Sequence, residues 1–302
     1  MSGDADSAPR QPLRDWIGRT EQRTDTLTAS PLAGRAATLD RITDAEPVAG
    51  TVLPPLAHWL YFLPQAPQSE IGADGHAQRG GFLPPVPLPR RMWAGGRLAF
   101  HHDLIVGDEA EWRSTITRVD AKQGRSGALV FVTVRHEITT ARGLALTEEH
   151  DIVYRDKPQP GALTPTAAPA AKMAPGDEQF SRVIVPDPVL LFRYSALTFN
   201  GHRIHYDRSY VTEVEGYPGL IVHGPLIATL LVDLLRREMP GAALKRFEFE
   251  AVSPLFDIHP FTLCGPRGAD GHVSLWARNH EGRLAIPARA ELIPAAMNSH
   301  SP

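Results

Sequence analysis

The sequence predicts an α+β protein built from two tandem units, each with an apolar helix and a run of antiparallel strands. Three observations carry this prediction. A nearly unbroken apolar run covers 226–235, and strand-like segments separated by turn residues fill 96–154. After residue 244 the alternation of apolar and polar residues returns, and the stretch 158–178, poor in large apolar side chains, separates the two patterns.

Length and composition limit the possible functions. A chain of 302 residues suffices for two domains, and a net charge of −3 excludes the basic surface of a nucleic-acid binder. The single cysteine, Cys264, excludes an internal disulfide and a cysteine-based zinc site. The polar stretch Met1 to Pro12 is unlike a secretory signal, and no apolar run has membrane-spanning length. We therefore expect a cytoplasmic protein with no membrane or nucleic-acid partner.

In the first unit, residues 13–63 are expected to be mostly helical, with helices at Thr38–Ile42 and Leu56–Leu63. The stretch Gln65 to Pro89 is rich in proline and glycine, which predicts a loop that forms a lid or rim over a site. A meander of four strands should follow, at 96–100, 111–119, 128–139 and 145–154.

In the second unit, the apolar run Leu226–Leu235 predicts a buried helix. Pro225 suits its first turn, and Gly224 just before it allows a backbone N–H to approach a ligand closely. Free N–H groups at a helix start favour an anion or a developing oxyanion. Strands are expected at 247–252, 273–278 and 284–292.

An unusual density of polar side chains precedes this helix, and few structural needs explain it. Within eight residues the chain carries Asn200, His202, His205 and Asp207. Together with 222–226, this segment resembles the signature of the MaoC-like (R)-specific enoyl-CoA hydratases, in which Gly-Asp-x-Asn-Pro-Ile-His-x-Asp precedes Ile-Ala-His-Gly-x-Leu. The matching residues here are Ile204-His205-Tyr206-Asp207 and Val222-His223-Gly224-Pro225-Leu226.

The wider chain is similar to the branch of this family that includes hydroxyacyl-thioester dehydratases and mesaconyl-C4-CoA hydratases. The resemblance implies a double hotdog, in which each curved antiparallel sheet wraps a central helix. It implies a degenerate substrate-binding unit at 1–157, a linker at 158–178 and a catalytic unit at 179–302.

One departure from the family concerns the catalytic pair. The family's aspartate falls at Asn200 and its asparagine at His202, and an amide cannot take a proton. The resemblance then implies a single-base scheme in which His205 is both base and acid. Asn200 would hold the water through its carbonyl oxygen, and the Gly224 N–H would stabilise the enolate-like charge.

Three neighbours are possible auxiliary residues. His202 could supply a second proton-transfer group, and Asp207 could orient His205 or simply cap the segment that follows it. His223 is expected to shape the turn before Gly224. A zinc site made from these histidines and Asp207 has the right residue types but no familiar spacing, so no metal is expected.

A thioester substrate brings phosphates and, for a dicarboxylic acyl group, a second carboxylate. Arginine binds both groups bidentately. The predicted substrate-binding residues are Arg193, Tyr194, Arg203, Pro225 and Arg91.

A short comparison supports an inactive first unit. The segment Val52-Leu53-Pro54-Pro55-Leu56 aligns with Val222–Leu226 and has Pro54 where the second unit has Gly224. Proline has no N–H to donate, so the first unit should bind substrate without catalysing the reaction.

The favoured function is hydration of an enoyl-CoA thioester, with mesaconyl-C4-CoA to citramalyl-CoA or the related itaconyl-CoA chosen from the family branch alone. Alternatives are a 3-hydroxyacyl-ACP or 3-hydroxyacyl-CoA dehydratase, a hotdog thioesterase, and a non-catalytic acyl-CoA binder, for which Asn200 is the sole evidence. No cofactor is expected, because coenzyme A is part of the substrate. The protein could be a monomer or a homodimer.

Overall fold

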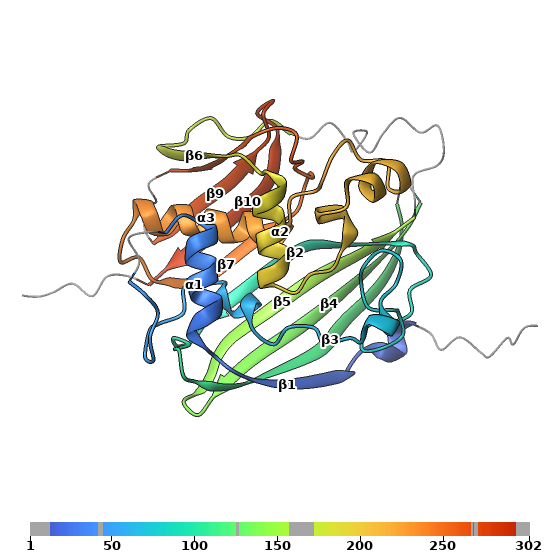
Figure 1. Ribbon diagram of the computed structural model, residues 1–302, viewed down its shortest axis with the longest axis horizontal. Helices are drawn as coiled ribbons and strands as arrows, with labels where there is room; N and C mark the ends of the chain where they lie inside the picture. Colours follow the sequence, from blue (N-terminus) through green and yellow to red (C-terminus); the bar gives the residue numbers. More distant parts are fainter. Residues whose placement is uncertain are drawn as a thin grey trace, which may run out of the picture.

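The computed structural model describes residues 13–41, 45–124, 127–156, 172–266, 268 and 271–293. Its strands form one antiparallel sheet in the order β1-β3-β4-β5-β2-β7-β10-β9-β8-β6 (Figure 1). The first half contributes β1 (Thr20–Thr26), β2 (Arg90–Phe100), β3 (Glu109–Gly124), β4 (Gly127–Thr140) and β5 (Gly143–Arg155). The second half contributes β6 (Phe180–Ile184), β7 (Leu244–Glu250), β8 (Phe261–Gly265), β9 (His272–Arg278) and β10 (Leu284–Leu292).

The two halves meet at one strand pair. Gly95 to Ala99 of β2 lie antiparallel to Glu250 to Arg246 of β7, so the two sheets are continuous. The meander predicted for the first half is confirmed for its last three strands, because β3, β4 and β5 pair in sequence order, whereas β2 pairs with β5. The architecture is a double hotdog of the α+β class.

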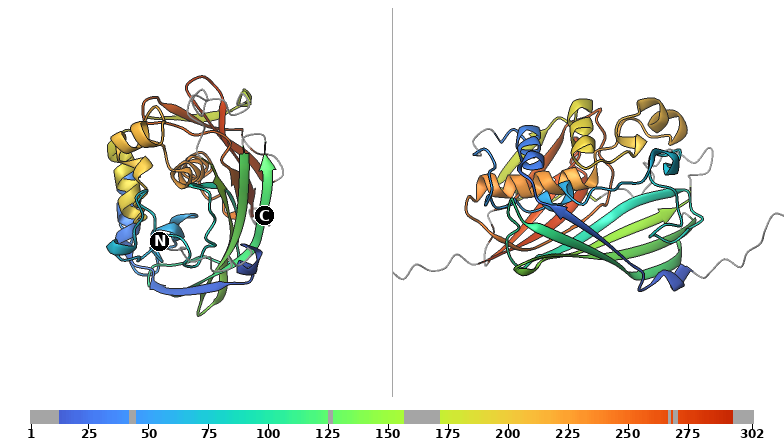
Figure 2. Two further views of the ribbon diagram at one scale, coloured as in Figure 1. Left: turned by 90° about the vertical axis from the view of Figure 1, so that its right-hand side faces the viewer. Right: turned by 60° about the horizontal axis from the view of Figure 1, so that its bottom comes forward.

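The helix α3 (Gly224–Glu238) lies inside the curve of the sheet, where the left view of Figure 2 shows it nearly end-on. Every residue from Leu226 to Leu235 is buried. The prediction of a buried central helix in the second unit is therefore confirmed, including its start at Gly224 and the proline in its first turn.

A buried carboxylate interrupts the apolar run of α3. Asp233 is completely buried and accepts hydrogen bonds from Arg41 Nε at 2.6 Å, Arg182 Nη1 at 3.0 Å and Arg237 Nε at 2.7 Å. Burial alone would raise the pKa of Asp233, but the bonds from Arg237 and Arg41 lower it below its usual range. Because Arg41 belongs to the first half, this cluster also ties the halves together.

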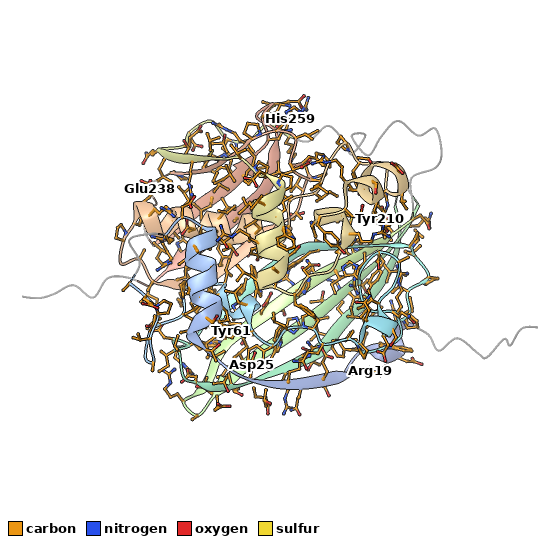
Figure 3. The ribbon with its side chains drawn as sticks, in the orientation of Figure 1. Arg19, Asp25, Tyr61, Tyr210, Glu238 and His259 are labelled. Carbon is orange, nitrogen blue, oxygen red and sulfur yellow. The ribbon has the colours of Figure 1, made fainter. Side chains whose placement is uncertain are left out.

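The helix predicted for the first unit at Leu56–Leu63 is wrong, because only a 3-10 turn at Ala57–Leu60 forms there. Leu56 and Phe62 both have positive φ, at 67° and 53°, which a helix does not allow. The Tyr61 hydroxyl donates to the Thr28 carbonyl at 2.6 Å and the Phe62 N–H to Asp25 at 2.8 Å, which holds this segment beside the end of β1 (Figure 3).

Other expectations for the first fifty residues also fail. The segment contains β1, and the helix expected at Thr38–Ile42 is instead α1 (Ala29–Thr38), which ends where the prediction began. α1 packs beside α2 (Pro188–Leu197), a helix that the sequence pattern did not predict. Most of the predicted linker, 157–171, lies outside the described residues. No helix in the described part of the chain is long and apolar enough to cross a bilayer.

Candidate active site

A cavity of about 1040 Å³ lies between the start of α3, the signature segment and the concave face of the first-half sheet. Where the alignment with Val222–Leu226 would place a central helix, the described part of the first half forms only the 3-10 turn Ala57–Leu60. Both halves line the cavity. From the signature come Asn200, His202, His205, Gly224 and Pro225, which the fold brings together as predicted.

The start of α3 is exposed to the cavity. The N–H groups in the first turn of a helix have no intrahelical acceptor, and Gly224 is the first residue of α3. A Cβ atom added to Gly224 would meet no atom within 4 Å, so the backbone borders open space here. The Gly224 N–H can therefore donate to a ligand oxygen.

His205 is oriented as a base. It ends the 3-10 turn Arg203–His205, is 7% exposed, and its Nδ1 lies 2.7 Å from the carbonyl oxygen of Ile221. Since a carbonyl only accepts, Nδ1 carries the proton and Nε2 keeps its lone pair. Burial lowers the pKa of His205 to about 4, so the imidazole is neutral at pH 7.

His223 supports this base. It is fully buried, and its ring stacks on that of His205 with centroids 3.7 Å apart. Its Nε2 bonds the Ser195 hydroxyl at 2.8 Å, and the Tyr194 ring lies 5.1 Å away. Burial lowers the pKa of His223 well below its ordinary value, which keeps the ring neutral. As predicted, His223 is the residue that leads into α3.

Asn200 differs from expectation in one respect. Its Oδ1 accepts from the His202 backbone N–H at 3.0 Å, so the oxygen expected to hold water is already engaged. The Nδ2 group is the part of the amide left to donate to a ligand. Asn200 therefore offers a hydrogen bond to an oxygen atom in the cavity.

Asp207 caps the turn that follows it. Its Oδ1 accepts from the Tyr210 N–H at 3.0 Å and the Ser209 hydroxyl at 2.9 Å, while Oδ2 pairs with Arg203 Nη2 at 2.7 Å. The capping alternative is confirmed, and the alternative that Asp207 orients His205 is wrong. The four residues considered for zinc do not converge, because Asp207 bonds to this turn instead.

The predicted substrate-binding arginines separate into two groups. Arg203 is held by Asp207 and the Ala73 carbonyl, and Arg193 is exposed on α2; neither lines the cavity. Both predictions are therefore unsupported. Arg91 does line the cavity, together with the predicted Tyr194 and Pro225.

Arg91 contacts polar rather than acidic groups. It hydrogen-bonds the Tyr154 hydroxyl. Burial lowers the pKa of both His202 and His150, and the nearby charge of Arg91 lowers each further. Among the described residues, no carboxylate forms an ion pair with Arg91 within 4.0 Å. Its cation is therefore available to an anionic group of a ligand.

Sequence reasoning missed two groups of cavity residues. The first is His76, with Asp74 hydrogen-bonded to it, from the loop expected to form a rim; this loop does line the cavity. The second is a polar wall on the first-half sheet, made by Ser114, His136, Glu148 and His150. The signal for the first was an Asp-x-His pair inside a glycine-rich loop. The polar wall draws on three strands, β3, β4 and β5, and only Glu148 and His150 are close in the sequence.

Comparison with known proteins agrees with the geometry. The sequence model of the hydroxyacyl-thioester dehydratase type 2 family matches residues 56–257. The mesaconyl-C4-CoA hydratase of Chloroflexus aurantiacus is 49% identical over 92% of this chain and 96% of its own. The mitochondrial hydroxyacyl-thioester dehydratase type 2 of Schizosaccharomyces pombe is 30% identical over 71% of this chain and 78% of its own.

Solved structures agree on the fold. A MaoC-like dehydratase from Phytophthora capsici superimposes with a TM-score of 0.68 at 14% identity, covering 94% of this chain and 98% of its own. A Mycobacterium tuberculosis protein described as a double hotdog has a TM-score of 0.56 at 16% identity, covering 93% and 98%. The resemblance inferred from the signature is confirmed: the chain belongs to the hydroxyacyl-thioester dehydratase type 2 family, a family of hydratases and dehydratases.

Proposed function

We propose that this enzyme hydrates mesaconyl-C4-CoA to citramalyl-CoA, an addition of water across the double bond of a C5 dicarboxylyl thioester. The observation that carries the proposal is the pairing of the free Nε2 of His205 with the Gly224 N–H at one cavity. A base and an oxyanion donor are the two groups that this addition requires. The 49% identity to a protein named for this reaction supports the choice of substrate.

The reaction begins when water attacks Cβ. His205 Nε2 takes a proton from this water, and the Asn200 amide donates a hydrogen bond to its oxygen. The electrons of the double bond move to the thioester oxygen, where the Gly224 N–H and the start of α3 stabilise the charge. One such donor lowers the barrier by about 3 kcal/mol. A proton must finally reach Cα.

Arg91 favours a dicarboxylic acyl group. In mesaconyl-C4-CoA the free carboxylate is bonded to Cβ, the carbon that water attacks, so its cationic partner must lie near the base. Arg91 has no acidic partner within the described part of the chain. It lies near His202, because burial lowers the pKa of His202 and the charge of Arg91 lowers it further. A bidentate bond from Arg91 to this carboxylate would select the dicarboxylic substrate.

The polar wall also favours a short polar acyl group. Ser114 and His136 bond each other at 2.9 Å, and Glu148 accepts from His58 at 3.0 Å, all on the surface where a long acyl chain would lie. These groups are nearly buried and hydrogen-bonded to protein, so an alkyl chain laid against them would contact polar atoms instead of the apolar side chains that favour its burial. This argues against a fatty-acid-type dehydratase. The scheme uses no cofactor, since coenzyme A arrives with the substrate.

The test follows the enoyl-thioester absorbance with mesaconyl-C4-CoA and crotonyl-CoA, which lacks the second carboxylate. The wild type should remove the band and His205→Ala should not. Arg91→Gln should reduce kcat/KM for mesaconyl-C4-CoA by about 10- to 100-fold, the worth of a charge-assisted hydrogen bond, and leave crotonyl-CoA within about 3-fold. Arg193→Gln, outside the cavity, is the matched control. Release of free thiol would identify a thioesterase instead.

A further inference from the structure

The segment from Glu70 to Gln78 forms a small hairpin inside the loop 65–89. Ile71 and Ala77 form an antiparallel bridge, and the Gln78 N–H donates to the Glu70 carbonyl at 2.8 Å. Gly75 at its tip has φ of 89°, a conformation that favours glycine. We call this segment the 70–78 hairpin.

The 70–78 hairpin is attached to the catalytic segment of the other half. The Arg203 N–H donates to the Asp74 carbonyl at 2.9 Å, and Arg203 Nη1 donates to the Ala73 carbonyl at 3.0 Å. A Cβ at Gly75 would lie 1.8 Å from the Gly201 oxygen, so the two backbones touch. The tip of the hairpin is therefore held against the residues that follow Asn200.

This contact places His76 in the cavity wall, with Asp74 hydrogen-bonded to its ring. Asp74 Oδ2 lies 3.0 Å from His76 Nδ1, and Asp74 Oδ1 accepts from the His76 backbone N–H at 3.0 Å. Burial alone would raise the pKa of Asp74, but the hydrogen bond from His76 lowers it below the usual range of a carboxyl. The carboxylate is therefore ionised, Nδ1 of His76 carries a proton, and Nε2 is the nitrogen left for proton transfer.

The pair adjoins the position where the family carries its aspartate. The His76 ring lies 4.0 Å from that of His202, which in turn lies 5.4 Å from that of His205. His202 is two residues from Asn200 and bonds it through the backbone. A second imidazole with its own carboxylate thus stands beside the amide that cannot take a proton.

We infer that His76, oriented by Asp74, is the second acid–base group of the hydratase and replaces the carboxylate missing at Asn200. The inference rests on the proposed hydration. Water forms the C–O bond at Cβ and loses its proton to His205 Nε2. The enolate then takes a proton on Cα from His76 Nε2 as the thioester carbonyl re-forms. The proton on His205 returns to His76 by way of His202 or solvent, which restores both residues.

The surroundings of the two histidines assign these roles. His205 bonds only a neutral carbonyl, so its imidazolium is poorly stabilised and it acts as the base. His76 bonds an ionised carboxylate, which stabilises its imidazolium and suits it to act as the acid. Burial and the charge of Arg91 lower the pKa of His76 in the free enzyme. A substrate carboxylate bound to Arg91 would offset that charge and raise the pKa of His76 from its free-enzyme value, which favours the protonated acid when a dicarboxylic substrate is bound.

The experiment compares kcat for mesaconyl-C4-CoA in wild type, His76→Ala, Asp74→Asn, Asn200→Asp and the double variant His76→Ala/Asn200→Asp. Loss of a proton-transfer group should cost His76→Ala about 10²- to 10⁴-fold in kcat. Asp74→Asn should also reduce kcat and shift the alkaline limb of its pH profile. In the double variant the new carboxylate should recover at least about 10-fold, as expected for a proton-transfer group restored nearby.

A merely structural role for the hairpin would give equal losses in the single and double variants, and that result overturns the inference. So does wild-type kcat in His76→Ala. Either result leaves the proposed function intact as long as wild type hydrates the substrate and His205→Ala does not.

Atoms of Asp74, His76 and His202 also lie within 4.8 Å of one another, a set that can hold zinc. Activity lost to a chelator and restored by zinc would overturn the acid–base assignment.

Discussion

Replacing Gly224 by proline removes the proposed oxyanion donor with little change to the rest of the molecule. Gly224 is the first residue of α3, where the N–H has no intrahelical acceptor and proline is well tolerated. His223 before it has φ of −59° and ψ of 129°, which a following proline accepts. Alanine at the same position keeps the N–H and adds one methyl group, whose Cβ meets nothing within 4 Å. The two variants together isolate the N–H.

We expect Gly224→Pro to reduce kcat for mesaconyl-C4-CoA hydration by about 10²- to 10³-fold relative to Gly224→Ala, because one oxyanion donor contributes about 3 kcal/mol. The assay is the loss of enoyl-thioester absorbance under saturating substrate. Thermal unfolding followed by circular dichroism checks that both variants fold. If the proline variant folds and keeps kcat within about 3-fold of the alanine variant, the N–H takes no part in the reaction and the reasoning fails.

Three further outcomes are expected. Because burial lowers the pKa of His205 to about 4, the acid limb of kcat/KM that reports this base should lie near pH 4; an acid limb with its inflection near 6.5 would contradict this. Asp233→Ala removes the carboxylate that three arginines share and should lower the free energy of unfolding in urea by about 3–5 kcal/mol. An unchanged urea midpoint would show that this carboxylate does not stabilise the fold. Gly75→Ala is strained at φ 89° and meets the Gly201 oxygen, so it should lower both the thermal unfolding temperature and kcat; wild-type kcat in the folded variant would show that the hairpin contact is dispensable.

The family signature could be predicted from the sequence because its residues lie close together along the chain. His205, Asn200 and Gly224 fall at positions of the signature that the segment resembles, and all three line one cavity. The buried helix after Gly224 followed from a ten-residue apolar run. Capping by Asp207 was one of two roles that the sequence allowed, and its bond from the Tyr210 N–H decides between them.

The wrong predictions lie in segments where tertiary contacts override the local preference for secondary structure. The apolar segment from Leu56 to Leu63 has a helical composition, yet the positive φ angles of Leu56 and Phe62 break the helix, and Tyr61 and Phe62 bond to residues near the end of β1. Arg203 looked like a ligand-binding cation, but its partners are Asp207 and a carbonyl in the other half. A linear pattern cannot tell a free arginine from a paired one.

The sequence by itself determined the family and the central helix of the second unit, because a short motif and an apolar run are each contained in a few neighbouring residues. It also predicted the base and the oxyanion donor. Only the tertiary structure decided what surrounds them. Asp74 and His76 reach the catalytic loop from a hairpin more than a hundred residues earlier, through backbone contacts between two glycines. Such contacts depend on how the two halves join through β2 and β7, and no local pattern records that geometry.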